Sequence, residues 1–215
     1  MTRTILLPSQ LLGTFAILAF VPTGTFKAVL LLLLWTITFW PIRKKEFLLF
    51  VLINIIFVFS DLGAIRNNFF SFTKPDIGAL PYFEFFMWGF YLMHAKRMLN
   101  GRYPPRIEPV VILLASSFAA IFVIAPVGSA VLILSASVLL LSLWKFHERA
   151  DVLYFTYLSG IGVIVEYIGL YFNLWQYSQG YLLSFVQIII MWGAAGLYFR
   201  RLVGPLFYEN EKVNQ

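Results

Sequence analysis

Cysteine is absent from the 215-residue chain, and histidine occurs only as His94 and His147. The absence of cysteine excludes disulfides, thiolate catalysis, thiolate zinc sites and iron–sulfur clusters. Two histidines are too few for a histidine-rich dinuclear metal centre. Charge is scarce as well, because only 12% of the residues are charged, whereas about 25% is usual in soluble domains. No hydrophilic stretch is long enough to form a second, soluble domain.

Long apolar runs fill most of the chain, with 60% hydrophobic residues and a mean hydropathy of +0.83. A helix needs roughly 20 apolar residues to cross a bilayer. We therefore predict an all-α, polytopic integral membrane bundle, with one domain over 1–207 and a polar cytoplasmic tail at 208–215. The sequence shows no obvious internal repeat. The eight predicted transmembrane helices are 5–21, 26–40, 46–65, 77–97, 109–125, 129–144, 151–172 and 180–199.

The basic residues favour one orientation of this bundle. With eight spans both termini lie on the same side of the membrane, and that side then holds thirteen of the sixteen lysines and arginines. Lys27, Arg66 and Lys74 lie on the other side. Because cytoplasmic loops carry an excess of positive charge, we predict that both termini are cytoplasmic. The compact loops favour a bacterial inner membrane, and the net charge of +6 is explained by the membrane surface without a nucleic-acid partner.

Three acidic residues, Asp61, Glu84 and Glu166, lie within predicted spans. A charged side chain at a helix centre costs about 2.5–3.5 kcal/mol on insertion scales, so such residues point to function. At 1.5 Å per residue, the predicted topology places the three acids and Gln187 about 5–11 Å below the outer boundary. A simpler interpretation of Asp61 is pairing with Arg66. Four polar groups on four helices at one level predict a pocket on the outer-leaflet side.

Helical spacing predicts which side chains line this pocket. Trp88 and Tyr91 share a helix face with Glu84, and Asn54 precedes Asp61 by almost two full turns. The outer loop that precedes the fourth helix is either a lid over the pocket or a simple connector. The predicted substrate-binding residues are Trp88, Tyr91, Asn173, Gln187 and Asn54, and the predicted catalytic acids are Glu166, Glu84 and Asp61.

Buried carboxyl groups beside aromatic rings suit acid catalysis. Burial and a neighbouring carboxylate both favour the protonated form of a carboxylic acid, which is then a competent proton donor. Aromatic faces such as that of Trp88 stabilise a passing cation. This chemistry suits protonation of an alkene in a polyprenyl or carotenoid-like lipid. The same acids suit a proton-coupled small-molecule transporter, and a non-catalytic membrane scaffold needs them only for helix packing.

A second polar cluster, at residues 145–151, includes His147, Glu148 and Asp151. Its residue types allow a divalent metal, but such a run is more typical of a solvated loop with local ion pairs, in which Asp151 is the N-cap of the next helix. We therefore assign no metal site. His94, next to two basic residues, predicts an interfacial basic edge that contacts phosphate headgroups.

Three segments stand out in the second half of the chain: 146–151, then 162–169 (Gly-Val-Ile-Val-Glu-Tyr-Ile-Gly) with Trp175-Gln176-Tyr177, and 191–201. Together they resemble membrane carotenoid hydratases of the bacterioruberin and spirilloxanthin pathways. The family has a Gly-Phe-Pro-Phe-Gly-type segment where residues 171–175 read Tyr-Phe-Asn-Leu-Trp. The resemblance implies a multi-helix membrane enzyme that uses an acid and no cofactor, acts on an isoprenoid lipid, and carries Glu166 at the matching position.

Overall fold

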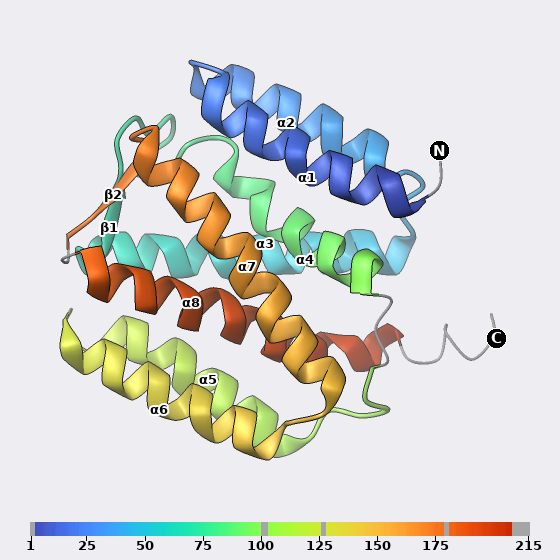
Figure 1. Cartoon of the computed structure of the whole chain (residues 1–215), viewed down its shortest axis with the longest axis vertical. Coiled ribbons are helices and arrows are strands. Elements are labelled where there is room, and N and C mark those ends of the chain that lie inside the picture. Colours follow the sequence, from blue (N-terminus) through green and yellow to red (C-terminus); the bar gives the residue numbers. More distant parts are fainter. Residues whose placement is uncertain (1–2, 100–102, 126–127, 179–180, 208–215) are drawn as a thin grey trace. The chain divides into compact units, whose positions relative to one another are not determined.

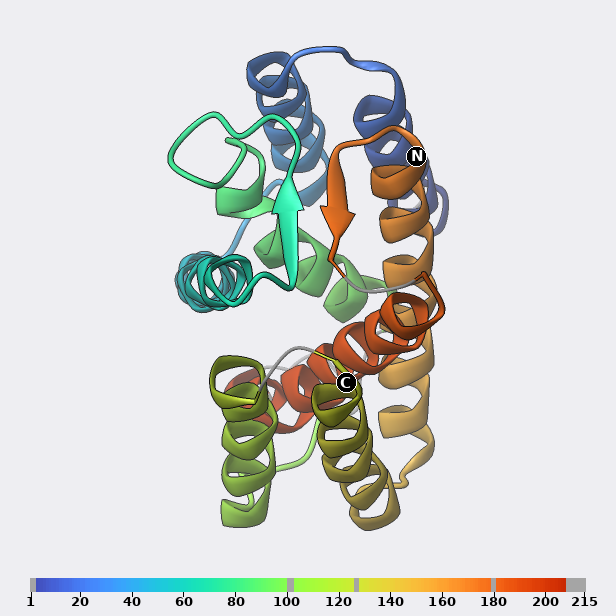
Figure 2. The same ribbon diagram turned by 90° about the vertical axis from the view of Figure 1, so that its left-hand side faces the viewer.

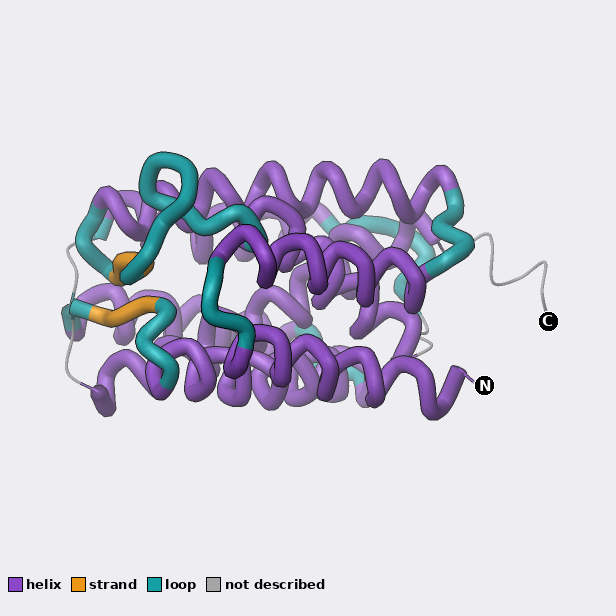
Figure 3. Tube along the Cα trace, turned by 90° about the horizontal axis from the view of Figure 1, so that it is seen from above, coloured by secondary structure: helices purple, strands orange, loops and turns teal. Residues whose placement is uncertain are grey.

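The computed structural model describes residues 3–99, 103–125, 128–178 and 181–207, and most of these residues are helical (Figure 3). This confirms the predicted all-α class, while the predicted tail at 208–215 lies outside the described residues. The last α-helix ends at Tyr198 and continues as a π-helix, η1 (Phe199–Val203), and a 3₁₀-helix, η2 (Gly204–Phe207). The elements in chain order are α1 (Arg3–Phe20), α2 (Gly24–Phe39), α3 (Lys44–Arg66), β1 (Phe70–Phe72), α4 (Glu84–Leu99), α5 (Pro109–Ile124), α6 (Ser129–Lys145), α7 (Arg149–Tyr171), β2 (Trp175–Tyr177) and α8 (Tyr181–Tyr198).

Three stretches are long and apolar enough to cross a membrane: α3, α7 and Phe185–Leu206. Four further apolar helices, α1 from Ile5 onward, α2, α5 and α6, are shorter. Many large apolar side chains on these helices are exposed, among them Leu12, Phe59 and Leu140. Large exposed apolar surfaces are rare on soluble monomers. Helix length and surface composition together indicate a membrane protein.

The order of the elements repeats halfway along the chain. Arg149, where α7 begins, stands 105 residues after Lys44, where α3 begins, and the last residues of the two helices, Tyr171 and Arg66, are also 105 residues apart. The helical hairpin α1–α2 precedes α3, as the hairpin α5–α6 precedes α7 (Figure 1). We call residues 3–99 the first repeat and residues 109–207 the second repeat. The repeat is not obvious in the sequence, and it becomes apparent in the order and bounds of the elements. Apolar side chains replace one another freely on lipid-facing helices, so the two repeats share their order of elements but have few identical residues.

The turns after α3 and α7 confirm this correspondence. Asn68 and Asn173, again 105 residues apart, both have a left-handed backbone, with φ of 56° and 52°. Left-handed residues commonly follow the C-terminus of a helix, and asparagine tolerates that conformation. In each turn the amide of the next residue donates to a carbonyl five residues back, from Phe69 to Ala64 at 2.9 Å and from Leu174 to Gly169 at 2.7 Å. Each long helix therefore ends in the same cap and leads into a strand.

The two strands pair with each other in an antiparallel ladder. Ser71 pairs with Gln176 at the centre, Phe70 pairs with Tyr177, and Phe72 pairs with Trp175. Figure 2 shows the strands side by side and running in opposite directions. Because the paired residues come from equivalent strands, the ladder has local two-fold symmetry. Neither strand is predicted by the hydropathy pattern, since three residues are too few to show an alternation, although aromatic residues favour strands.

The described chain forms two compact units that are not the two repeats. The first unit is Met1–His94 with Val165–Ser178, and the second is Ala95–Ile164 with Gln179–Gln215. The first unit therefore contains α1 to α3, most of α4, the end of α7 and both strands. The second contains α5, α6, the start of α7, and α8.

An aromatic core holds α2 against α4 in the first unit. Trp35 of α2 is fully buried, and its ring contacts those of Phe86, Phe90 and Tyr91 with centroid separations of 5.8, 4.6 and 5.9 Å. Its indole Nε1 donates to Thr14 Oγ1 at 2.6 Å, which satisfies the buried donor. This core positions α4, the helix that begins at Glu84.

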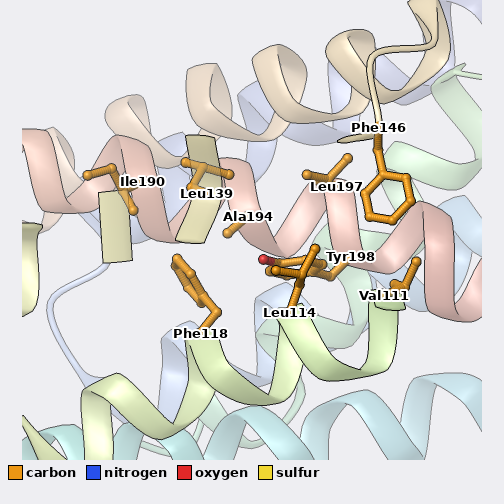
Figure 4. Packing of buried hydrophobic residues seen from close by; sticks show 9 residues of the cluster. All are labelled: Val111, Leu114, Phe118, Leu139, Phe146, Ile190, Ala194, Leu197 and Tyr198. Atoms are coloured by element: carbon orange, nitrogen blue, oxygen red, sulfur yellow. The ribbon is translucent and has the colours of Figure 1, made fainter. Parts of the chain in front are cut away.

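The core of the second unit is formed by α5, α6 and α8, whose apolar side chains point toward one another in Figure 4. Phe118 of α5 meets Tyr198 of α8 edge to face at 5.8 Å. The Tyr198 hydroxyl lies 2.8 Å from the Ser142 hydroxyl, so its polar end is also satisfied. The cluster consists of Val111, Leu114, Phe118, Leu139, Phe146, Ile190, Ala194, Leu197 and Tyr198.

The fourth helix begins later than predicted, at Glu84 instead of residue 77. Ile77 and Leu80 form a bridge around Gly78, whose φ is 59°, and Pro81 follows without an amide hydrogen to donate. This loop contacts the start of α2, because a Cβ at Gly24 would lie 2.4 Å from Asp76 Oδ2. Glu84 consequently lies in the first turn of its helix and not two turns inside it.

Candidate functional site

Three acidic residues from three helices come together in the first unit, and we call Asp61, Glu84 and Glu166 the acid site. The carboxyl groups of Asp61 and Glu84 are in hydrogen-bonding contact, and Glu166 is close enough to interact electrostatically with both. Glu84 and Glu166 are only 3% and 7% exposed, and Asp61 is half-buried. The structure thus brings the three sequence-predicted acids to one place, although they lie far apart in the sequence.

The indole of Trp88 links two of the helices at the acid site. Its Nε1 donates to Asp61 Oδ2 at 3.2 Å, and its ring stacks on Phe57 with a centroid separation of 4.1 Å. The spacing explains this arrangement, because Phe57 and Asp61 are four residues apart on α3, as Glu84 and Trp88 are on α4. Asp61 therefore bonds to an indole, instead of simply capping its helix beside Arg66 as the simpler interpretation holds.

Strand β2 supplies two hydrogen-bond donors to Glu166. Trp175 Nε1 and the Tyr177 hydroxyl both donate to Glu166 Oε2, at 2.7 and 2.9 Å. Burial, together with the neighbouring Glu166 carboxyl, raises the pKa of Tyr177 well above its usual value, so the phenol stays a neutral donor. In the sequence these two aromatics stand out only within the short segment Trp175-Gln176-Tyr177. The signal that could have identified them is their spacing of two residues, because residues i and i+2 of a strand lie on the same face.

Gly169 makes this arrangement possible. It lies three residues after Glu166 on α7, and a Cβ at this position would be 2.0 Å from Cζ2 of Trp175. Real side chains never approach so closely. The absence of a side chain therefore lets the indole lie directly against α7, one turn from the carboxylate to which it donates.

Of the five predicted substrate-binding residues, Trp88 and Tyr91 lie at the acid site. Tyr91 is buried and interacts electrostatically with Glu84 and Glu166. Asn54 instead joins α3 to α4, because its Oδ1 accepts the Gly89 amide at 2.8 Å.

The other two predicted residues have different surroundings. Asn173 lies past the end of α7, where its Oδ1 accepts a hydrogen bond from Thr73 Oγ1 at 3.4 Å. Gln187 belongs to the second unit and donates to Ser135 Oγ at 3.2 Å.

His94 is buried and does not form the predicted interfacial edge, since only 1% of it is exposed. Its Nδ1 lies 2.7 Å from Gln10 Oε1, and the Gln10 amide donates to Thr14 Oγ1 at 3.0 Å. The basic neighbours of His94 suggest a surface position, but the helix turn directs its ring toward α1. A buried polar chain thus links α1, α2 and α4 in the first unit.

A buried ionic cluster lies in the second unit at the start of α7. Asp151 is fully buried, and Arg200 and Arg201 bind its two carboxylate oxygens. Glu148, which is 57% exposed, bonds to both arginines at 2.6 and 2.9 Å. The hydrogen bond from Arg200 is the main cause of a lowered pKa of Glu148, so this carboxylate persists below the pH at which a free glutamate protonates.

This cluster differs from the solvated loop that the sequence predicts. Asp151 is not the N-cap either, because α7 begins two residues earlier, and its Oδ2 accepts the Glu148 amide at 3.2 Å. Within the described residues, no three His, Cys, Asp or Glu side chains are grouped so that they could hold a metal ion.

Comparison with known proteins identifies no relative. No family model matches the chain, and neither a curated protein nor a solved structure matches it.

Proposed function

We propose that the protein is an integral membrane enzyme whose acid site protonates a carbon–carbon double bond of an isoprenoid or carotenoid-like lipid, leading to hydration or ring closure. The observation that carries this proposal is the set of hydrogen bonds to the acids. Trp88 donates to Asp61, and Trp175 and Tyr177 donate to Glu166, and these two indoles and one phenol are neutral donors. Neutral donors orient a carboxyl group without locking it into an ion pair, so the group remains free to exchange protons. The resemblance of residues 162–169 to carotenoid hydratases agrees with this chemistry.

The reaction follows from ordinary acid–alkene chemistry. The O–H bond of a neutral carboxylic acid breaks while the π electrons of the alkene form a new C–H bond, leaving a carboxylate and a carbocation. In hydration, water adds to the cation and the oxonium then gives up a proton. In ring closure, a second double bond attacks the cation, and a neighbouring carbon then loses a proton. Either route returns one proton to the carboxylate, so the acid is regenerated.

Aromatic rings beside the acids suit the cationic intermediate. Trp88, stacked on Phe57, and the buried Tyr91 present π faces and edges within the same unit. The faces of such rings attract cations, and the attraction grows where water is excluded. A site of this kind stabilises positive charge that develops on a hydrocarbon chain. Such a chain has no polar group with which a hydrogen bond could form.

The proposal includes the predicted topology of eight spans with both termini in the cytoplasm of a bacterium. Two repeats of four helices agree with it, because four spans return the chain to its starting side. Since the chain lacks cysteine, each introduced cysteine is a single reporter. We expect Lys74→Cys to react with a membrane-impermeant maleimide on intact cells, and Lys45→Cys and His147→Cys to react only after permeabilisation. Labelling of all three on intact cells would contradict the topology.

Lipid mass spectrometry of the purified protein tests the function. We expect Glu166→Gln to retain a specific isoprenoid that the wild type converts, because loss of the carboxylate impairs turnover while the apolar surroundings stay intact. Glu108→Gln is the matched control, since Glu108 lies outside the acid site and its side chain contacts Arg201 at 3.4 Å. Bulk phospholipid alone in every sample would refute an isoprenoid substrate.

One observation favours proton-coupled transport as a second candidate. The chain from His94 through Gln10 and Thr14 to Trp35 places further buried polar groups in the same unit as the acids. A transporter needs polar groups along its path, whereas an enzyme with a closed pocket does not. Acidification inside proteoliposomes upon solute addition, abolished by Glu84→Gln, would favour transport. If acid-to-amide variants change stability alone, a scaffold role is favoured.

A further inference from the structure

The internal repeat extends to α4 and α8 and supplies a comparison for every residue of the acid site. Met87-Trp88-Gly89 and Met191-Trp192-Gly193 are 104 residues apart, and so are the basic pairs 96–97 and 200–201. Equivalent residues are 105 apart up to the strands and 104 apart in α4 and α8, so the second repeat is one residue shorter between its strand and its last helix. The two helices can therefore be aligned residue by residue.

Contacts within each unit support this alignment. A Cβ at Gly89 would lie 2.5 Å from side-chain atoms of Phe50 and of Asn54. A Cβ at Gly193 would lie 2.2 Å from Phe155 and 2.5 Å from Ser159. Phe155 and Ser159 are the second-repeat counterparts of Phe50 and Asn54, each 105 residues later. The packing of α4 on α3 is thus repeated in the packing of α8 on α7.

The acids differ in how they follow the repeat. Asp61 and Glu166 occupy equivalent positions, so both repeats carry a carboxyl group there. Glu84 aligns with Ile188, and each is 3% exposed. Tyr91 aligns with Ala195. The fold therefore accepts an isoleucine, fully buried, at the position where the first repeat has a glutamate.

We propose that Glu84 is present for proton transfer and not for folding, and that it is the acid which delivers the proton in the proposed reaction. Asp61 and Glu166 are then positioning residues. A buried carboxyl group is costly to insert in a membrane, whereas isoleucine is favourable there, so a glutamate without a structural need requires another explanation. The second repeat has an isoleucine at the aligned position, inside α8 and not at a helix start, so the packing of the aligned helices does not by itself require a carboxyl group there. The delivery role depends on the proposed function, whereas the absence of a folding role does not.

The contacts assign the positioning roles. The Asp61 carboxyl meets that of Glu84 and accepts the Trp88 indole, so it orients both side chains. Glu166 Oε2 accepts two donors from β2 and holds that strand against α7. Glu84, in the first turn of its helix, is in hydrogen-bonding contact with Asp61 and Trp88, and it is the acid that the second repeat replaces with an isoleucine, so we assign proton delivery to it.

Reciprocal exchange of the aligned residues tests the proposal. We expect Glu84→Ile to melt at the same temperature as the wild type or higher, and Ile188→Glu to melt lower. The melting curves need no substrate, so they decide the folding role even if no isoprenoid is found. A large drop in the melting temperature of Glu84→Ile, equal to that of Ile188→Glu, would overturn the proposal.

Conversion of the lipid found with the wild type tests the delivery role. Glu84→Gln should abolish conversion at every pH, whereas Asp61→Asn and Glu166→Gln should leave slow conversion with a displaced pH profile. The conservative variants Asp61→Glu and Glu166→Asp should recover the wild-type profile. Conversion by Glu84→Gln would refute the delivery role. If the wild type converts no lipid, the proposed function and the delivery role fail together, while the melting result stands.

Discussion

Replacing Asp151 with alanine is expected to destabilise the protein by about 3–5 kcal/mol, the usual cost of removing one partner from a buried ion pair. Arg200 and Arg201 both bind this carboxylate, and both are themselves buried. Without it, both guanidinium groups keep their contacts with the more exposed Glu148, and Arg201 keeps a 3.4 Å contact with Glu108. Thermal and chemical unfolding in detergent, followed by circular dichroism, measures the loss.

Glu108→Ala is the control for this prediction. Glu108 belongs to the same cluster, but its side chain is 39% exposed and 3.4 Å from Arg201. Partly exposed pairs contribute up to about 1 kcal/mol, so this variant should remain close to the wild type. Equal losses in the two variants would show that burial of Asp151 is not what makes it important.

Gly169→Ala is expected to have the second-largest effect, because the new methyl group would enter the Trp175 indole ring. Overpacking of this kind costs about 1–3 kcal/mol. The displaced indole also loses its 2.7 Å hydrogen bond to Glu166, and a bond to a charged group contributes about 1.5–3 kcal/mol more. We expect a lower melting temperature together with a change in near-ultraviolet circular dichroism from the moved tryptophan.

Gly160→Ala on the same helix is the matched control, because a Cβ there would meet no atom within 4 Å. Alanine favours a helix over glycine by up to about 1 kcal/mol, so this variant should be as stable as the wild type or slightly more stable. If both glycine variants lose stability alike, the close approach of Trp175 is not the cause.

Several features of the site cannot be read from hydropathy. A hydropathy pattern reports which residues avoid water, and it identifies α3 and α7 within two residues at each end. It does not separate a polar loop from a buried ion pair, so the Asp151 cluster looks like a solvated turn. It likewise misses the strands, whose pairing joins segments about 100 residues apart. Such long-range contacts leave no local trace.

The repeat also shows what a comparison of residue identities alone cannot detect. A few equivalent positions of the two repeats carry chemically similar residues, such as Phe50 with Phe155 and Glu46 with Asp151. Most equivalent positions carry different residues, because lipid-facing and core positions require only apolar volume. The helix bounds and the two left-handed asparagines are what reveal the correspondence. Backbone geometry is under a tighter steric constraint than side-chain identity.

By itself, the sequence determined the helical class, the membrane character and the presence of three acids in apolar surroundings, because these depend on composition and on the length of apolar runs. Tertiary structure alone decided that Asp61 and Glu84 touch, that Trp175 and Tyr177 hold Glu166, and that two arginines enclose Asp151. The physical reason is range. Transfer free energy acts residue by residue along the chain, whereas a hydrogen bond or ion pair forms only after packing has brought distant helices within about 3 Å of each other.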